Sequence, residues 1–227
     1  MVVLFVSDSY RPYVSGVVVS LEWTARQLAR LGHQVVLAVP APGRQAREGG
    51  LGLLAPPEAE PRPCPSQTGL VRVVTLPSLP APGVRGFRFP LPWAAPLYRA
   101  LRRWGLRPQV VHAHSPFVAG RLALHLGRQL GCPVVFTHHT LYHLYAHYGK
   151  LPQRLVRPLT WRYVARYCRR VDGVVAPSEP VRELVVRGYG VTRPVRVIPT
   201  GIHLEPFLRA SPGPARQRLG LRHEEPL

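Results

Sequence analysis

The chain has 227 residues, of which 46% are hydrophobic and 18% charged, so it can bury a core and is not a disordered polymer. Its 27 Pro and 20 Gly show no three-residue period, which excludes a collagen-like chain. The net charge of +19, from 30 basic against 11 acidic residues, indicates either an acidic partner or a solvated Arg-rich surface. The small number of carboxylates argues against Ca²⁺ cages.

Apolar runs and helical patterns alternate along the chain. The apolar runs predict strands at Val2–Val6, Gln34–Val39, Val71–Leu76, Val110–Ala113, Pro133–Thr137, Gly173–Ala176 and Val195–Ile198. Helical spacing predicts helices at Ser20–Leu31, Trp93–Trp104, Phe117–Leu130, Leu151–Arg170 and Glu179 to about Arg187. Residues 41–69 are interpreted as a long loop and Pro77–Pro92 as irregular.

Continuous apolar strands separated by helices predict an α/β fold, with a Rossmann-like parallel sheet covered by helices on both faces. Ligands of such sheets bind beyond the carboxyl ends of the strands. Polar residues follow these ends and are expected to meet at one edge: Ser7–Asp8, His114–Ser115, His138–His139, Ser178 and Thr200–Gly201.

The compartment is predicted from the cysteines and from the absence of membrane signals. Cys64, Cys132 and Cys168 are widely spaced and form no Cys-x-x-Cys pair, which favours a reducing compartment. The first residues, MVVLFVSD, do not resemble a signal peptide, and no apolar run approaches the roughly 20 residues that span a bilayer. We expect a cytoplasmic protein that rests, at most, on the inner face of a membrane.

Gly16 precedes a predicted helix and follows Ser15. A glycine there allows a ligand to approach the backbone, and a helix amino terminus favours an anion, although ordinary turns also use glycine. The chain has neither a Gly-x-Gly-x-x-Gly motif after its first strand nor a Walker A motif. It therefore lacks the motifs of a dinucleotide-binding or P-loop protein.

Residues 137–148 are unusually rich in histidine and read THHTLYHLYAHY. His139, His143 and His147 would share one face of a helix, so metal binding is one hypothesis, beside substrate contacts and structural hydrogen bonding. No zinc-protease glutamate follows His143, and we expect no metal. His112 and His114 are expected to alternate on their strand, so that only one of them points at a given face, and His114, nearer the edge, is the better candidate for chemistry.

Two enzyme classes and one binding class lack their motifs. Asp8 and Asp172 are the only aspartates, and neither pairs with a carboxylate as glycoside hydrolysis requires. No serine lies in a Gly-x-Ser-x-Gly turn. We expect no nucleic-acid partner, because aromatic and basic residues are not interleaved in a recognised motif.

An anionic membrane surface is a candidate for the acidic partner. Trp93, Leu97, Leu101 and Trp104 form one helical stripe, and arginines at positions 99, 102, 103 and 107 lie largely off it. Such a helix either lies in an anionic membrane interface or packs on the sheet.

Four segments together resemble glycosyltransferase family 4: residues 12–40, VVHAHSPFVAGRLAL (110–124), PVVFTHHTLYHLYAHY (133–148) and residues 169–207. They follow the family's order over nearly the whole chain. The THHTLY…YAHY stretch is similar to the bacterial branch that glucosylates diacylglycerol, a relative of the phosphatidylinositol mannosyltransferases. The resemblance implies the N-terminal half of a GT-B fold, with residues 1–207 as the acceptor-side domain and 208–227 as a linker stub.

By motif position the resemblance also implies site residues. His114 would be catalytic and face the reacting sugar. Gly16, Thr200 and Gly201 would lie near the donor diphosphate. The remaining cleft residues would be Asp8, Ser15, Thr137, His138, His139, Tyr142 and Ser178.

The function implied is retaining transfer of a hexose from a UDP- or GDP-sugar to a hydroxyl acceptor, such as a glycerolipid. No tightly bound cofactor is implied, and the departing diphosphate helps to deprotonate the acceptor. Because the family's donor-gripping residues do not occur in this chain, we expect it to be inactive by itself. The alternatives are a non-catalytic half-protein that binds an acceptor or a membrane, and a transferase with a soluble acceptor.

Overall fold

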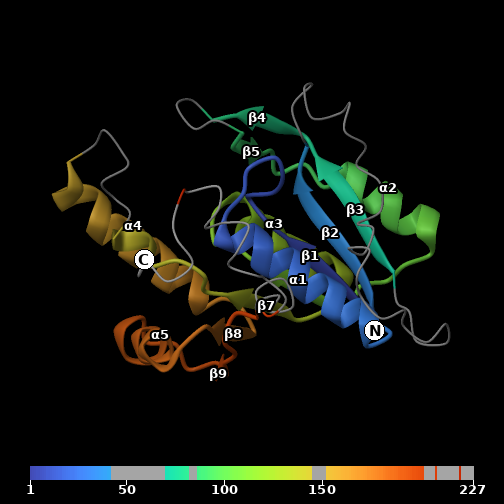
Figure 1. Ribbon diagram of the computed structural model, residues 1–227. Helices are drawn as coiled ribbons and strands as arrows, with labels where there is room; N and C mark the ends of the chain where they lie inside the picture. The colour runs from blue at the N-terminus through green and yellow to red at the C-terminus, as the bar shows by residue number, and fades with distance from the viewer. Residues whose placement is uncertain (42–69, 82–85, 145–151, 202–207, 209–219, 221–227) are drawn as a thin grey trace.

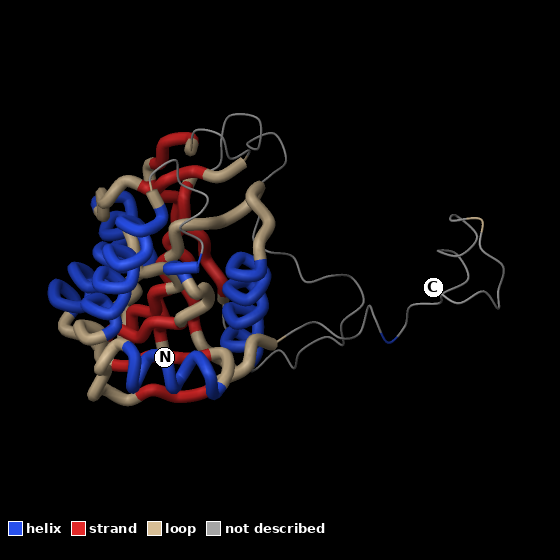
Figure 2. The backbone as a smooth tube through the Cα atoms, turned by 90° about the vertical axis from the view of Figure 1, so that its left-hand side faces the viewer, coloured by secondary structure: helices blue, strands red, loops and turns tan. Residues whose placement is uncertain are grey.

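The computed structural model describes residues 1–41, 70–81, 86–144 and 152–201, together with Leu208 and Gly220. Several predictions concern residues outside these ranges: most of the 41–69 loop with Cys64, the third histidine of the spaced set, His147, and almost all of the 208–227 stub. The architecture is an α/β sandwich in which helices cover both faces of one sheet, as the sequence predicted (Figures 1 and 2).

The main sheet is entirely parallel, with the strand order β3-β2-β1-β6-β7-β8-β9. Its strands are β1 (Val2–Val6), β2 (Gln34–Pro40), β3 (Val71–Leu76), β6 (Val110–Ala113), β7 (Val134–Thr137), β8 (Gly173–Ala176) and β9 (Val195–Val197). The order reverses between β1 and β6, so these two neighbours form the topological switch point at which such sheets bind ligands.

The strand β1 shows why the sheet is buried on both faces. Leu4 and Val6 enter one core cluster with residues of α2, α3 and α4, whereas Val3 and Phe5 enter a second cluster under α1. Successive side chains of a strand point to opposite faces, so a strand between two helical layers is apolar throughout.

The helices are α1 (Gly16–Arg30), α2 (Ala95–Trp104), α3 (Val118–Leu130), α4 (Gln153–Cys168) and α5 (Glu179–Glu183), which continues as the π-helical turn η3 (Leu184–Gly188). Helix α1 begins at Gly16 instead of the predicted Ser20. Ser15 has extended backbone angles, and its hydroxyl accepts a hydrogen bond from the N–H of Val18 at 3.4 Å. This is an N-cap, which the following run of β-branched valines conceals in the sequence.

The segment predicted to be irregular contains a short antiparallel pair, β4 (Ser78–Pro80) and β5 (Arg88–Pro90). The guanidinium of Arg88 donates to the hydroxyl and the carbonyl of Ser78, at 3.0 and 2.6 Å. Both strands end in a proline, which in a sequence usually argues against a strand. Proline is nevertheless tolerated in edge strands, so the pair forms although the sequence does not reveal it. The pair lies above the main sheet (Figure 1).

The stripe proposed to lie in a membrane interface belongs largely to the core. Leu97 is 0% and Leu101 4% exposed, and Trp104 packs against the same cluster. Trp93 lies before the helix and is 58% exposed. Helix α2 is therefore a covering helix of the sheet, and its apolar stripe is not available to a membrane. In the part of the chain that is described, no helix combines the length and the apolar character needed to cross a bilayer.

Candidate functional site

A cavity of about 600 Å³ opens at the carboxyl ends of β1, β6 and β7, beside the amino terminus of α1. Its lining consists of Asp8, Ser9, Tyr13, Ser15, Gly16, Val17, Phe87, His114, Ser115, Phe117, His139, Thr140, Tyr142 and Thr200. Two further cavities, of about 450 and 460 Å³, lie beside α5 and beside the start of β7, away from these strand ends. The switch-point cavity is therefore the candidate site.

Asp8 forms part of the floor but is held by the protein. One carboxylate oxygen accepts the N–H of Ala119 at 2.7 Å, and the other accepts the hydroxyl of Ser115. Asp8 is 7% exposed, and burial raises the pKa of its carboxyl group. Both oxygens are thus engaged in joining β1 to the first turn of α3, and Asp8 positions the loop that carries His114 and Ser115.

His112 and His114 lie on the same side of the sheet, so the expectation that only one of them would do so was wrong. Residues two positions apart on a strand share a face. The two rings stack with their centres 4.4 Å apart, and His112 Nε2 lies 2.7 Å from Thr137 Oγ1. Only His114 reaches the cavity, although it is 2% exposed.

The His114 ring meets that of His139, which follows β7. His114 Nδ1 and His139 Nε2 are 3.0 Å apart. Burial lowers the pKa of His114 well below its usual value and that of His139 to about 4. Both rings are therefore neutral at physiological pH.

Two residues predicted to line the cleft lie behind it. Thr137 is bound to His112 and is outside the lining. His138 is 1% exposed among the rings of Phe136, Tyr142 and Tyr189, and both of its ring nitrogens lack a partner. Along the chain from His138 to His139 the side chains alternate, so only the second one faces the cavity.

The described part of the histidine-rich segment does not place His139 and His143 on one helix face, as the metal hypothesis required. Residues 142–144, the last described before the gap at 145–151, form a 3₁₀ turn that begins after His139, and the His143 ring contacts Trp161. Among the described residues, no group of three or more histidine, cysteine, aspartate or glutamate side chains is arranged to hold a metal ion.

Aromatic side chains form two walls of the cavity. On one side, Phe117 packs edge-on against Tyr142 at 5.1 Å and face-on against Tyr163 of α4 at 5.7 Å. On the other side, the Tyr13 ring meets Phe87 at 5.1 Å. Sequence reasoning did not assign Tyr13, Phe87, Phe117 or Thr140 to the site. Phe87 in particular reaches it through β4 and β5, which have no clear sequence signal.

The predicted donor-side residues do not all meet in the cavity. Ser15, Gly16 and Thr200 line it, and a Cβ atom added at Gly16 would meet nothing within 4 Å. Gly201 lies outside the lining, and a Cβ there would be 3.1 Å from the ring of Trp23, so its small size serves packing. Ser178 precedes α5 and also lies outside the lining.

The charge of the chain is not concentrated in the cavity. None of its described lining residues is a lysine or an arginine, although the net charge is +19. The feature of the described lining that favours an anion is the amino terminus of α1, where backbone N–H groups meet the open space at Gly16.

An open parallel α/β sheet with a polar cavity at its switch point defines a class of small-molecule-binding proteins. A family model described as Glycosyltransferase Family 4 matches residues 14–206. The chain belongs to this family, as its motifs predicted.

Two curated relatives are named alpha-monoglucosyldiacylglycerol synthase. The one from Streptococcus pneumoniae is 30% identical over 204 residues, covering 89% of this chain and 41% of the relative. The one from Acholeplasma laidlawii is 28% identical and covers 96% and 52%. A GDP-mannose-dependent alpha-mannosyltransferase from Mycobacterium tuberculosis is 30% identical and covers 81% and 43%. The chain thus spans about half the length of these relatives.

Solved structures with the same fold include a sucrose-phosphate synthase from Thermosynechococcus elongatus, with a TM-score of 0.59 at 15% identity. The alignment covers 99% of this chain and 53% of that protein. The UDP complex of UGT89C1 from Arabidopsis thaliana gives a TM-score of 0.54, also at 15% identity, and covers 99% and 55%. These neighbours are GT-B glycosyltransferases, and this chain has about half of that fold, as the sequence predicted.

Proposed function

We propose that the protein transfers a hexose from a UDP- or GDP-sugar to the hydroxyl group of an amphiphilic acceptor such as a glycerolipid. The observation that carries this is the switch-point cavity, in which a polar floor, two aromatic walls and the open amino terminus of α1 meet. Family membership supports the donor class. Two relatives are named as diacylglycerol enzymes, which supports a lipid acceptor. A third is named for GDP-mannose, and one structural neighbour was solved with UDP, so both nucleotides remain in the proposal.

Retention of anomeric configuration fits the lack of a free carboxylate in the described lining. Asp8 is the sole acidic residue there, and both its oxygens accept hydrogen bonds from the protein. A base is not required if the departing diphosphate takes the acceptor's proton, and the main electrostatic task is then to stabilise that diphosphate. In this proposal His114 faces the reacting sugar, and the neighbouring residues of the floor orient the acceptor.

We assign residues 1–207 to the acceptor side and 208–227 to a connecting segment. With no lysine or arginine in the described lining, the donor diphosphate would meet the amino terminus of α1 and groups outside this chain's cavity. The 227-residue chain, assayed alone with UDP- and GDP-hexoses and diacylglycerol, is therefore expected to show no turnover. Turnover above background would contradict this assignment.

The function is tested in a chain of the relatives' length, about twice the present one, which is called the whole protein below. Gly16→Leu places a side chain in open space, so it should leave the melting temperature unchanged and weaken donor binding by about tenfold or more. Gly173→Ala is the matched control, because its Cβ would make one ordinary contact, at 3.6 Å, away from the cavity. Absence of sugar transfer to any acceptor, or undisturbed donor binding in Gly16→Leu, would contradict the proposal.

Helix α4 supports contact with an anionic membrane surface. Leu155, Leu159 and Tyr163 recur every four residues and are 57%, 63% and 37% exposed. Tyr163 joins this row to the cavity, because its ring stacks on Phe117 and its hydroxyl donates to the carbonyl of Pro116 at 3.0 Å. The row therefore leads from the cavity wall to the outer end of the helix.

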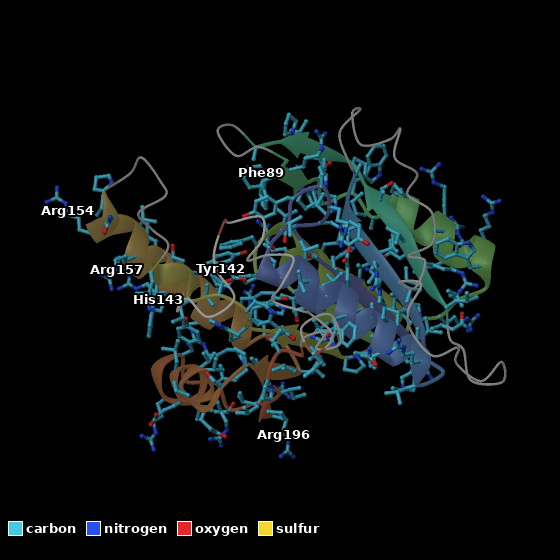
Figure 3. All side chains as sticks on the ribbon, in the orientation of Figure 1. Phe89, Tyr142, His143, Arg154, Arg157 and Arg196 are labelled. Carbon is cyan, nitrogen blue, oxygen red and sulfur yellow. The ribbon has the colours of Figure 1, made fainter. Side chains whose placement is uncertain are left out.

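The charge of α4 favours an anionic partner. The helix contains four arginines and no acidic residue. All four arginines are exposed: Arg154, Arg157, Arg162 and Arg166. Its amino-terminal end projects from the sheet, with Arg154 and Arg157 pointing outward (Figures 1 and 3). Exposed leucines beside arginines are typical of helices that lie in an anionic interface.

Vesicle sedimentation tests this surface. Binding to vesicles that contain phosphatidylglycerol should fall with salt and drop by about tenfold or more in Arg162→Gln/Arg166→Gln, since each basic residue contributes about 1 kcal/mol. The matched control is Arg99→Gln/Arg102→Gln on α2, whose apolar stripe is buried. Equal losses in both variants would show a diffuse charge effect and reject α4 as the contact.

The same measurement separates the alternative functions. Vesicle binding without sugar transfer in the whole protein would favour the non-catalytic module. Sugar transfer without vesicle binding would favour a soluble acceptor.

A further inference from the structure

The contact between His114 and His139 is a direct hydrogen bond between two ring nitrogens. His114 Nδ1 lies 3.0 Å from His139 Nε2, the ring centres are 5.2 Å apart and the ring planes differ by 20°. This distance between the ring centres is about the nitrogen–nitrogen distance plus the distance from each ring centre to its own nitrogen. The rings are therefore nearly coplanar and joined edge to edge, which places the shared hydrogen in the plane of both rings, as a strong hydrogen bond requires.

The surroundings keep His114 in this orientation. One face of its ring lies on His112 at 4.4 Å, and the Phe5 ring is 4.7 Å away. His112 is itself held by Thr137. The His114 ring consequently cannot rotate to exchange its nitrogens without disturbing the β6 and β7 ends.

A hydrogen bond between two neutral imidazoles contains one proton, so one ring donates and the other accepts. The remaining nitrogen of the donating ring is then bare, and the remaining nitrogen of the accepting ring carries a hydrogen. If His114 Nδ1 donates, His114 Nε2 is a bare acceptor and His139 Nδ1 carries a hydrogen. If His139 Nε2 donates, both roles are reversed. Burial keeps both rings neutral, since it disfavours the charged form of each.

The structure distinguishes these two states. His114 Nε2 is enclosed and has no protein partner, whereas the half-buried His139 ring has no nitrogen of this kind. Among backbone groups, enclosed N–H groups without a partner are rarer than enclosed carbonyl acceptors without one, and we extend this preference to the ring nitrogens of His114. The favoured state therefore has the hydrogen on His114 Nδ1 and a bare His114 Nε2.

We propose that His139 is a positioning residue that fixes the tautomer of His114, keeping the hydrogen on Nδ1 and leaving the enclosed Nε2 of His114 bare. This inference rests on the proposed function for its consequence: the fixed tautomer holds the His114 ring in one orientation beside the cavity, where the proposed function places the reacting sugar. The tautomer itself does not depend on that function and is measured without it.

The first test is nitrogen-15 NMR of the histidine rings in the full chain. Wild type should show a protonated Nδ1 and a bare Nε2 on His114. In His139→Phe this preference should be lost, and in His139→Gln, whose amide oxygen can accept the same hydrogen, it should return. The matched control is His138→Phe, which changes the neighbouring buried ring and should leave the His114 signals unchanged.

A wild-type His114 that carries its hydrogen on Nε2 would overturn the proposal, whether or not any variant folds. An unaltered His114 tautomer in folded His139→Phe would also overturn it.

The second test uses the whole protein and separates the two proposals. If it transfers sugar, His139→Phe should lower kcat by about tenfold or more with a smaller change in KM, and His139→Gln should restore part of kcat. Equal effects of the Phe and Gln variants would show a structural role for the ring. A wild type without transfer refutes the proposed function, and the NMR result still decides the tautomer.

Discussion

Helices α2 and α4 have similar compositions and opposite places in the molecule. Both are rich in arginine, contain no acidic residue and carry leucines at helical spacing. Leu97 and Leu101 of α2 are 0% and 4% exposed, whereas Leu155 and Leu159 of α4 are 57% and 63% exposed. An apolar stripe thus shows that a helix has an apolar side, but the position of the helix relative to the sheet decides what that side contacts.

The two halves of α4 repeat this contrast within one helix. Val164, Ala165, Tyr167 and Cys168 are buried in its carboxyl-terminal half. The amino-terminal half extends past the sheet (Figure 1). We therefore expect the first half to contribute little to global stability, which leaves it available for a partner.

The largest expected difference concerns the leucines. Leu97→Ala and Leu101→Ala should each lower the free energy of unfolding by about 2–5 kcal/mol, because they leave cavities beneath α2. Leu155→Ala and Leu159→Ala should change it by less than about 0.5 kcal/mol, since both side chains are largely in water. Urea unfolding of the four variants measures this, and a cost above about 2 kcal/mol at Leu155 or Leu159 would break the comparison.

A second prediction concerns pH, because neutral histidines are buried at the carboxyl ends of β6 and β7. Burial lowers the pKa of His112 to about 3 and those of His138 and His139 to about 4, whereas an unfolded chain titrates near about 6.5. The unfolded state then binds more protons, so the stabilisation is complete above about pH 6.5 and is lost as the pH falls toward 4. Asp8, whose pKa burial raises, acts in the opposite direction but is one group.

Thermal unfolding between pH 7.5 and 4.5 should therefore show a falling melting temperature. Hydrogen exchange should show α2 losing protection together with the sheet, while the amino-terminal half of α4 exchanges rapidly throughout. A melting temperature that stays constant over this range would contradict the neutral state of these rings.

The smallest expected effect concerns the end of α2. The Arg72 guanidinium of β3 lies 5.4 Å from the centre of the Trp104 ring, a cation–π contact that ties this end to the sheet. A double-mutant cycle with Arg72→Met and Trp104→Leu should give a coupling of about 0.5–1 kcal/mol. The same cycle with exposed Arg99 in place of Arg72 should give no coupling, and a similar value there would show that the effect is not specific to the contact.

Some of the site followed from local sequence and some did not. The polar residues after β1, β6 and β7 were predictable, because carboxyl ends of neighbouring parallel strands meet at one edge. Which of them face the cavity was not predictable. His138 points away from the side that His139 faces, whereas Thr137 is bound to His112 behind the cavity. Tyr13 and Phe87 were missed, because their meeting depends on a strand pair that prolines conceal.

The amino-acid sequence by itself determined the α/β class, the central strands and the family, since strands buried on both faces are continuously apolar and the family's motifs are local. Only the tertiary structure decided the use of each apolar helix face, the filling of the space beside Gly201 by Trp23, and the pairing of His114 with His139. These outcomes depend on contacts between residues far apart in the chain. No periodicity or spacing contains such contacts, because they arise only when the layers pack.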